Sequence, residues 1–102
     1  MSDKGPTRYK LDHAFEVEEK IQAIAAIARK GGQLKDFASL MKKALELLHN
    51  DPCGWGDPEF HSKSVEGTDY HSLLRPVSFR YVVYEQVRSV VLLNIRLYAD
   101  FK

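Results

Sequence analysis

Four side chains in the second half of the sequence have the chemistry needed to hold or transform an anionic group. They are His71, Arg80, Arg96 and Tyr98. A guanidinium stabilises negative charge by electrostatics, and an imidazole titrates near neutral pH and can act as an acid or a base. The candidate site of this chain is therefore an Arg/His/Tyr group.

Other kinds of site lack their sequence signatures. The glycines at 31–32 and at 54 and 56 have neither the flanking strand and helix nor the lysine of a phosphate-binding loop. The four histidines lie far apart, and Cys53 has no partner two to four residues away, so no metal-binding spacing is present. No nucleophile-elbow motif occurs, although a Ser/His/Asp group in another setting stays open. We therefore expect neither a metal nor a cofactor.

Length, composition and charge narrow the class of protein. With 102 residues, 44% of them hydrophobic, the chain has room for one core, and we expect one domain over 8–102 after a flexible lead-in at 1–7. The sequence has no apolar run long enough to span a bilayer and no signal-peptide pattern, and a lone Cys53 fits a reducing compartment, so we expect a cytoplasmic protein. The formal net charge of +1 weakens the case for nucleic-acid binding, because proteins that bind phosphates usually carry a marked basic excess.

An early strand and two amphipathic helices precede the candidate residues. Alternation over 8–13 predicts a strand, and Asp12 is placed to cap the helix that begins at residue 14. Its apolar residues recur every three or four positions, at Val17, Ile21, Ile24 and Ala28. A second helix, with Asp36 as its candidate N-cap, ends before Pro52. The short link at 31–35 predicts that the two helices form an antiparallel hairpin.

Extended segments make up the rest of the chain. Residues 51–59, rich in Pro, Gly and Asp around Trp55, predict a structured loop, and 60–65 predict a short strand or an extended connection. Strands are predicted at 69–74, 79–85 and 88–97. Because so few residues separate the last two, we expect them to pair as an antiparallel hairpin.

Alternation along the last two strands sorts their side chains by face. Strict alternation places Val91, Leu93, Ile95 and Leu97 against the helices, and places Asn94, Arg96 and Tyr98 opposite, with Val90 and Leu92. On the preceding strand Arg80 shares a face with Val82 and Tyr84. The hairpin therefore predicts that Arg80 and Arg96 lie on the same open face of the sheet.

This α+β layout of β-α-α-β-β-β, with an antiparallel sheet packed on a helical hairpin, resembles the RelE/ParE superfamily, the toxins of bacterial type II toxin–antitoxin pairs. The likeness runs from Arg8 to Leu97. Three stretches carry it: Asn50-Asp51-Pro52 with a following Gly, Tyr70-His71-Ser72-Leu73-Leu74-Arg75, and Phe79-Arg80-Tyr81-Val82-Val83-Tyr84. The third is close to the aromatic-Arg-x-x-x-Tyr pattern of the family.

The resemblance assigns roles to the candidate residues. In the ribosome-dependent nucleases of the family, basic residues on the central strands and a basic or aromatic residue near the C-terminus hold the scissile phosphate and assist attack by the 2′-hydroxyl. By position, the strand arginine is Arg80, and two lysines of the nucleases fall on His71 and Leu73. The chain stops at Lys102, before the family's C-terminal helix, so that Tyr98 or Arg96 takes the place of its tyrosine.

The partners implied are a cognate antitoxin and either the ribosome with its mRNA or DNA gyrase, with no membrane and no small-molecule cofactor. If Arg80, His71, Arg96 and Tyr98 act together, the chain is an mRNA endoribonuclease. Leu73 cannot stabilise a phosphate, and the net charge is low. These two departures favour the alternatives, which stay open on the sequence: a ParE-like inhibitor of gyrase, or a diverged, non-catalytic protein-interaction domain of the same fold.

Overall fold

A computed structural model describes residues 9–62 and 67–99. The expected lead-in at 1–7 and part of the segment expected at 60–65 lie outside these ranges. The elements in chain order are β1 (Lys10–His13), α1 (Phe15–Lys30), α2 (Leu34–Asn50), α3 (Pro52–Trp55), β2 (Asp57–Ser62), β3 (Gly67–Leu74), β4 (Val77–Tyr84), the 3-10 turn η1 (Glu85–Val87) and β5 (Ser89–Leu97). None of the helices in the described part of the chain is long and apolar enough to cross a membrane.

The helical hairpin forms as predicted, with different caps. The buried residues of α1 are Val17, Ile24 and Ala28, spaced seven and four apart, and those of α2 are Phe37, Ala44 and Leu48. Asp12 does not cap α1, because the strand continues to His13 and the N-cap is Ala14. Asp36 lies inside the first turn of α2, which begins at Leu34. Both helices are thus defined by their apolar stripes, since neither N-cap side chain makes a capping hydrogen bond.

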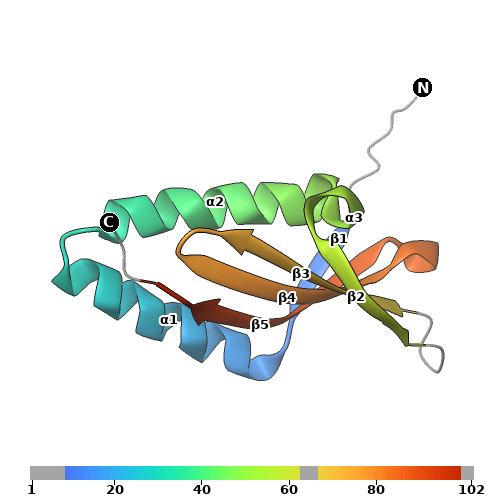
Figure 1. Cartoon of the computed structure of the whole chain (residues 1–102), viewed down its shortest axis with the longest axis horizontal. Helices are drawn as coiled ribbons and strands as arrows, with labels where there is room; N and C mark the ends of the chain where they lie inside the picture. The colour runs from blue at the N-terminus through green and yellow to red at the C-terminus, as the bar shows by residue number, and fades with distance from the viewer. Residues whose placement is uncertain (1–8, 63–66, 100–102) are drawn as a thin grey trace.

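The sheet has five strands in the order β1-β5-β4-β3-β2 (Figure 1). The predicted strand, helical hairpin and three-stranded antiparallel set are confirmed as β1, α1–α2 and β3–β4–β5. Strand β1, however, pairs parallel to β5, and the chain between these two strands runs through the helical hairpin and strands β2, β3 and β4. The predicted loop at 51–59 contains the short helix α3 and the start of β2, which pairs antiparallel with β3.

One face of the sheet packs on the helices, and strand β5 changes which of its residues face them. Val90 and Leu92 are buried in the core, and so is Ile95. Arg80 pairs with Asn94 while its neighbour Tyr81 pairs with Leu92. Leu93 is therefore the extra residue of a β-bulge, which shifts the alternation by one position.

Because of the bulge, the predicted face assignment is right for the residues of β5 after Leu93 and wrong for the residues before it. Ile95 lies against the helices and Arg96 opposite, as strict alternation from the strand end predicts. Before the bulge the prediction is wrong: Val90 is fully buried, and Val91 is opposite Val82, on the face away from the helices. We call this second face, which carries His71 and Arg80, the open face.

Candidate functional site

Two rows of side chains cross three strands on the open face. His71 on β3 is paired with Arg80 on β4, which is paired with Asn94 on β5. The second row lies two residues away from the first on each strand and consists of Leu73, Ser78 and Arg96. Residues opposite one another in a sheet, and residues two apart on one strand, point to the same side. The register alone therefore gathers these six side chains into one patch.

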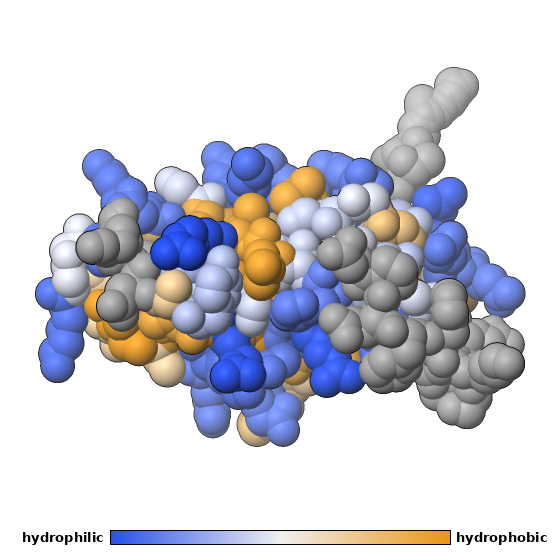
Figure 2. Space-filling view, viewed as in Figure 1, coloured by the Kyte–Doolittle hydropathy of each residue, from blue (hydrophilic) through white to orange (hydrophobic). Residues whose placement is uncertain are grey.

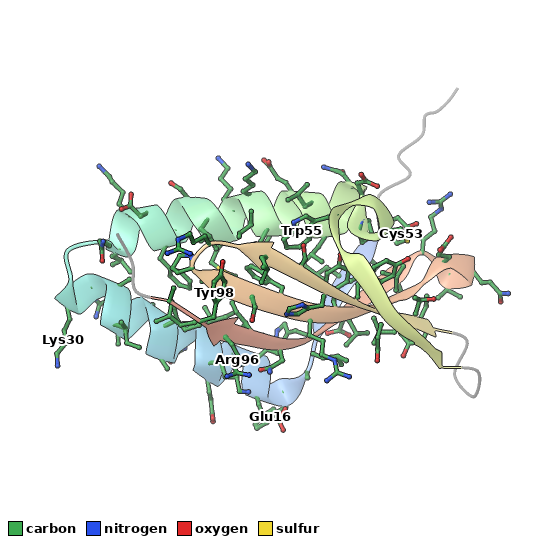
Figure 3. All side chains as sticks on the ribbon, in the orientation of Figure 1. Glu16, Lys30, Cys53, Trp55, Arg96 and Tyr98 are labelled. Carbon is green, nitrogen blue, oxygen red and sulfur yellow. The ribbon has the colours of Figure 1, made fainter. Side chains whose placement is uncertain are left out.

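Five of the six side chains line a pocket of about 170 Å³, the cationic pocket: His71, Ser78, Arg80, Asn94 and Arg96. Three of the four residues predicted from the sequence thus come together there. Tyr98 does not line it. It follows the last paired residue of β5, donates its backbone N–H to the carbonyl of Pro76 at 2.9 Å, and is 44% exposed. Figure 3 shows Tyr98 apart from Arg96, toward the turn end of the β3–β4 hairpin.

Asp69 holds the guanidinium of Arg80. Its Oδ2 lies 3.3 Å from Nη2 of Arg80, and its carboxylate is largely buried while the arginine side chain is about half exposed. Because the arginine end of this ion pair is half exposed to solvent, we expect the pair to add little to stability. Its effect is to restrict the orientation of the guanidinium, leaving the exposed half of the side chain to face the pocket.

Lys20 of α1 contacts Asn94, one of the residues that line this pocket. Its Nζ donates to Oδ1 of Asn94 at 2.6 Å, although the two residues are 74 positions apart. Strand β1 covers β5 only from Ser89 to Leu92, so the edge of β5 beyond Leu92 is not paired with β1. Lys20 could not be found from the sequence, because its partner depends on this edge and two acidic residues precede it in the chain.

The charge around the cationic pocket is positive. Arg80 and Arg96 line it with two positive charges, Lys20 brings a third through its contact with Asn94, and Asp69, the partner of Arg80, brings one negative charge. Figure 2 shows strongly hydrophilic side chains over the middle of this face, beside a hydrophobic patch above the β3–β4 hairpin. Among the described residues no group of three or more His, Cys, Asp or Glu side chains could hold a metal ion. The pocket is suited to binding an anion.

Trp55 is held at the edge of this face by a stack of aromatic rings. Its ring stacks on Tyr81 at 5.7 Å between centroids and contacts Phe79 at 5.3 Å, and Tyr70 stacks on the ring of Tyr81 at 5.5 Å. The hydroxyl of Tyr81 donates to the carbonyl of Pro52 at 2.6 Å, which fixes α3 to the sheet. The tryptophan is thus positioned by its contacts with core residues.

Replacing Tyr81 by phenylalanine tests this clamp. Loss of the hydroxyl leaves the buried carbonyl of Pro52 without its donor, so we expect the free energy of unfolding at pH 7 to fall by about 1–3 kcal/mol. Tyr98→Phe, at an exposed residue, is the matched control and should leave stability unchanged. Urea unfolding followed by circular dichroism measures both. Equal stabilities of the two variants would contradict the assigned role of the clamp.

Tyr81 and Tyr70 predict that the protein loses stability at alkaline pH. Burial raises the pKa of Tyr81 and of Tyr70 well above the ordinary tyrosine value of about 10. The folded state therefore keeps protons that the unfolded state releases above pH 10. We expect these two tyrosines to lower stability above that pH, by up to about 1.4 kcal/mol per pH unit each. In urea titrations from pH 8 to 11, Tyr81→Phe should lose less stability with rising pH than the wild type, and an unchanged slope would contradict the assignment.

Comparisons with known proteins agree with this fold. No protein-family model matches the chain, and no curated protein sequence matches it. A chain of the crystal structure of an archaeal RelE–RelB complex from Pyrococcus horikoshii OT3 matches with a TM-score of 0.64 and 12% sequence identity, over 89% of this chain and 96% of that chain. A likeness at this identity concerns the fold. The predicted RelE/ParE-like fold class is therefore confirmed.

Proposed function

We propose that this protein is the toxin of a toxin–antitoxin pair and that it cleaves mRNA on the ribosome. The observation that carries the proposal is the cationic pocket, in which Arg80, Arg96 and His71 meet on the open face of a RelE-like fold. Residues from three different strands reach this pocket through the sheet register. An accessible cluster of this kind is what the binding of a phosphate group requires.

In the proposed reaction, the two arginines hold the scissile phosphate. The 2′-hydroxyl oxygen bonds to phosphorus, the bond from phosphorus to the 5′-oxygen breaks, and the products are a 2′,3′-cyclic phosphate and a 5′-hydroxyl. His71 takes the proton of the 2′-hydroxyl, and water supplies the proton that the leaving 5′-oxygen takes up. The His71 imidazolium then returns its proton to the solvent. Arg80 and Arg96 stabilise the extra negative charge that develops on the phosphate oxygens. Asp69 keeps Arg80 in place during this step.

The proposed partner is a cognate antitoxin, a second protein that binds the toxin and blocks it. The matching fold was crystallised as a RelE–RelB complex, which supports a protein partner of this type for a chain of the same fold. Action on ribosomes would place the protein in the cytoplasm. A short reading frame for a DNA-binding protein beside the gene would support the pairing.

A second candidate function is binding without cleavage, to gyrase or to another protein. Leu73 favours it, because this apolar side chain is 52% exposed beside Ser78 and Arg96, where the resemblance expects a lysine. The net charge of +1 favours it as well. In this case the protein would arrest growth while leaving mRNA intact.

Induced expression in bacteria tests the toxin proposal. The wild-type protein should arrest growth within a few generations, and co-expression of the proposed antitoxin should restore growth. Total mRNA examined after induction separates the two candidates, since cleaved transcripts support the nuclease and intact ones support binding alone. Normal growth with folded protein present at high level would overturn the toxin proposal.

A further inference from the structure

A second pocket adjoins the cationic pocket through His71. This edge pocket, of about 260 Å³, is lined by Trp55, His71, Ser72 and Leu73. Pairing of β2 with β3 ends at His71, so the edge of β3 is not paired with β2 at Ser72 and Leu73. The two pockets therefore share His71, and their linings together run from Arg96 on β5 to Trp55 beside β3.

The aromatic wall of the edge pocket is rigid. Trp55 is stacked nearly parallel on Tyr81, at 14° between ring planes, and the Ser72 hydroxyl donates to its backbone carbonyl at 3.4 Å. The ring is only partly buried, so some of its surface faces the pocket. A ring that is already fixed loses little conformational entropy when a ligand binds against it.

The lining of the edge pocket differs in kind from that of its neighbour. It offers an indole, an exposed leucine, a hydroxyl and an imidazole, and none of the described residues that line it is an arginine or a lysine. A phosphate would find its charge partners in the cationic pocket. A flat, weakly polar group, such as a nucleobase, could pack against the aromatic and apolar wall of the edge pocket. Its polar edge could form hydrogen bonds with the hydroxyl and the imidazole.

We propose that the edge pocket binds the base of a nucleotide whose phosphate lies in the cationic pocket. The inference rests on the proposed function, because it takes single-stranded nucleic acid as the ligand of the open face. It assigns Trp55 and Leu73 to the base and leaves the phosphate to Arg80 and Arg96. The exposed Leu73, which is unsuited to phosphate, thereby becomes part of the substrate site.

The single tryptophan of the chain makes the test direct, because Trp55 is the source of the tryptophan fluorescence. The purified protein is titrated with a pentamer of 2′-O-methyluridine, which cannot undergo attack by a free 2′-hydroxyl, and with the same pentamer lacking its bases. We expect the base-bearing pentamer to quench Trp55 and to bind at least about fivefold more tightly than the abasic one.

Two variants separate the pockets. Leu73→Ala should weaken binding of the base-bearing pentamer toward the abasic level and leave the abasic one unchanged. Arg80→Ala should weaken both pentamers alike. Leu45→Ala, at an exposed leucine of α2, is the matched control and should change neither. Because Leu73 is about half exposed, its replacement should leave the fold intact.

The outcomes distinguish the two proposals. Equal binding of both pentamers, lowered by Arg80→Ala, would overturn the base pocket and leave the phosphate site standing. No binding of either pentamer would overturn the base pocket together with the nuclease function. Stronger binding of the base-bearing pentamer that is insensitive to Leu73→Ala would also overturn the assignment, because the base would then lie elsewhere.

Discussion

Replacing Arg80 by alanine is expected to abolish the growth arrest caused by the wild-type protein. Arg80 lies at the centre of the cationic pocket, between His71 and Asn94 in the same row. Loss of one donor that stabilises developing charge in a transition state typically lowers the catalytic rate by about 10²–10³-fold. Colony counts after induction measure the effect, and immunoblotting confirms equal expression.

Two further variants show whether the effect of Arg80→Ala comes from losing a charge in the cationic pocket or from lowering the total charge of the protein. Arg29→Ala removes an exposed arginine from the last turn of α1 and should leave the arrest unchanged. Arg80→Lys retains the charge without the planar fork that pairs with Asp69, so we expect a partial loss. Full toxicity of a folded Arg80→Ala variant would contradict the assignment of the cationic pocket as the active site.

Replacing Val90 by aspartate is expected to unfold the protein, whereas the same change at Val91 is expected to be tolerated. Val90 is fully buried against the helices, and an unpaired buried charge costs about 3–5 kcal/mol or more. That is a large share of the 5–15 kcal/mol that stabilises a typical domain. Val91 lies on the open face and is partly exposed, so Val91→Asp should cost about 1 kcal/mol, the order of strand propensity differences.

Threonine keeps this comparison measurable if the aspartate variant does not fold. Thr has nearly the shape of Val and a high strand propensity, so Val90→Thr should lose about 1–3 kcal/mol through a buried hydroxyl. Val91→Thr should be close to neutral. Thermal unfolding followed by circular dichroism compares the four variants. A greater loss at Val91 than at Val90 would favour strict alternation and contradict the bulge at Leu93.

The helical hairpin and the succession of elements along the chain could be predicted from the sequence because each depends on a local pattern, whereas the parallel pairing of β1 with β5 depends on contacts between distant segments. The stripe of Val17, Ile24 and Ala28 has the helical period, and Gly31 and Gly32 follow it. The bulge at Leu93 could not be predicted. The run from Val90 to Leu93 is apolar at every position, so either face could be the buried one until Tyr81 and Leu92 are seen to pair.

Part of the candidate site could be predicted from the sequence, because that part also depends on a local pattern. Arg80 and Arg96 share the open face because each lies beyond the bulge, where alternation holds from the strand ends. Lys20 and Asp69 join the site through contacts between distant elements, which no local pattern records. The assignment of catalytic roles to His71 and Tyr98 stays a prediction, and the structure sets Tyr98 outside the cationic pocket.

Cleavage of mRNA in a reconstituted translation system tests the central proposal most directly. The purified protein is added to ribosomes translating a defined message, and primer extension maps any new ends. The account predicts cleavage within the ribosomal decoding site by the wild-type protein, reduced at least about 100-fold by Arg80→Ala and unaffected by Arg29→Ala. An intact message in the presence of folded wild-type protein would contradict the account.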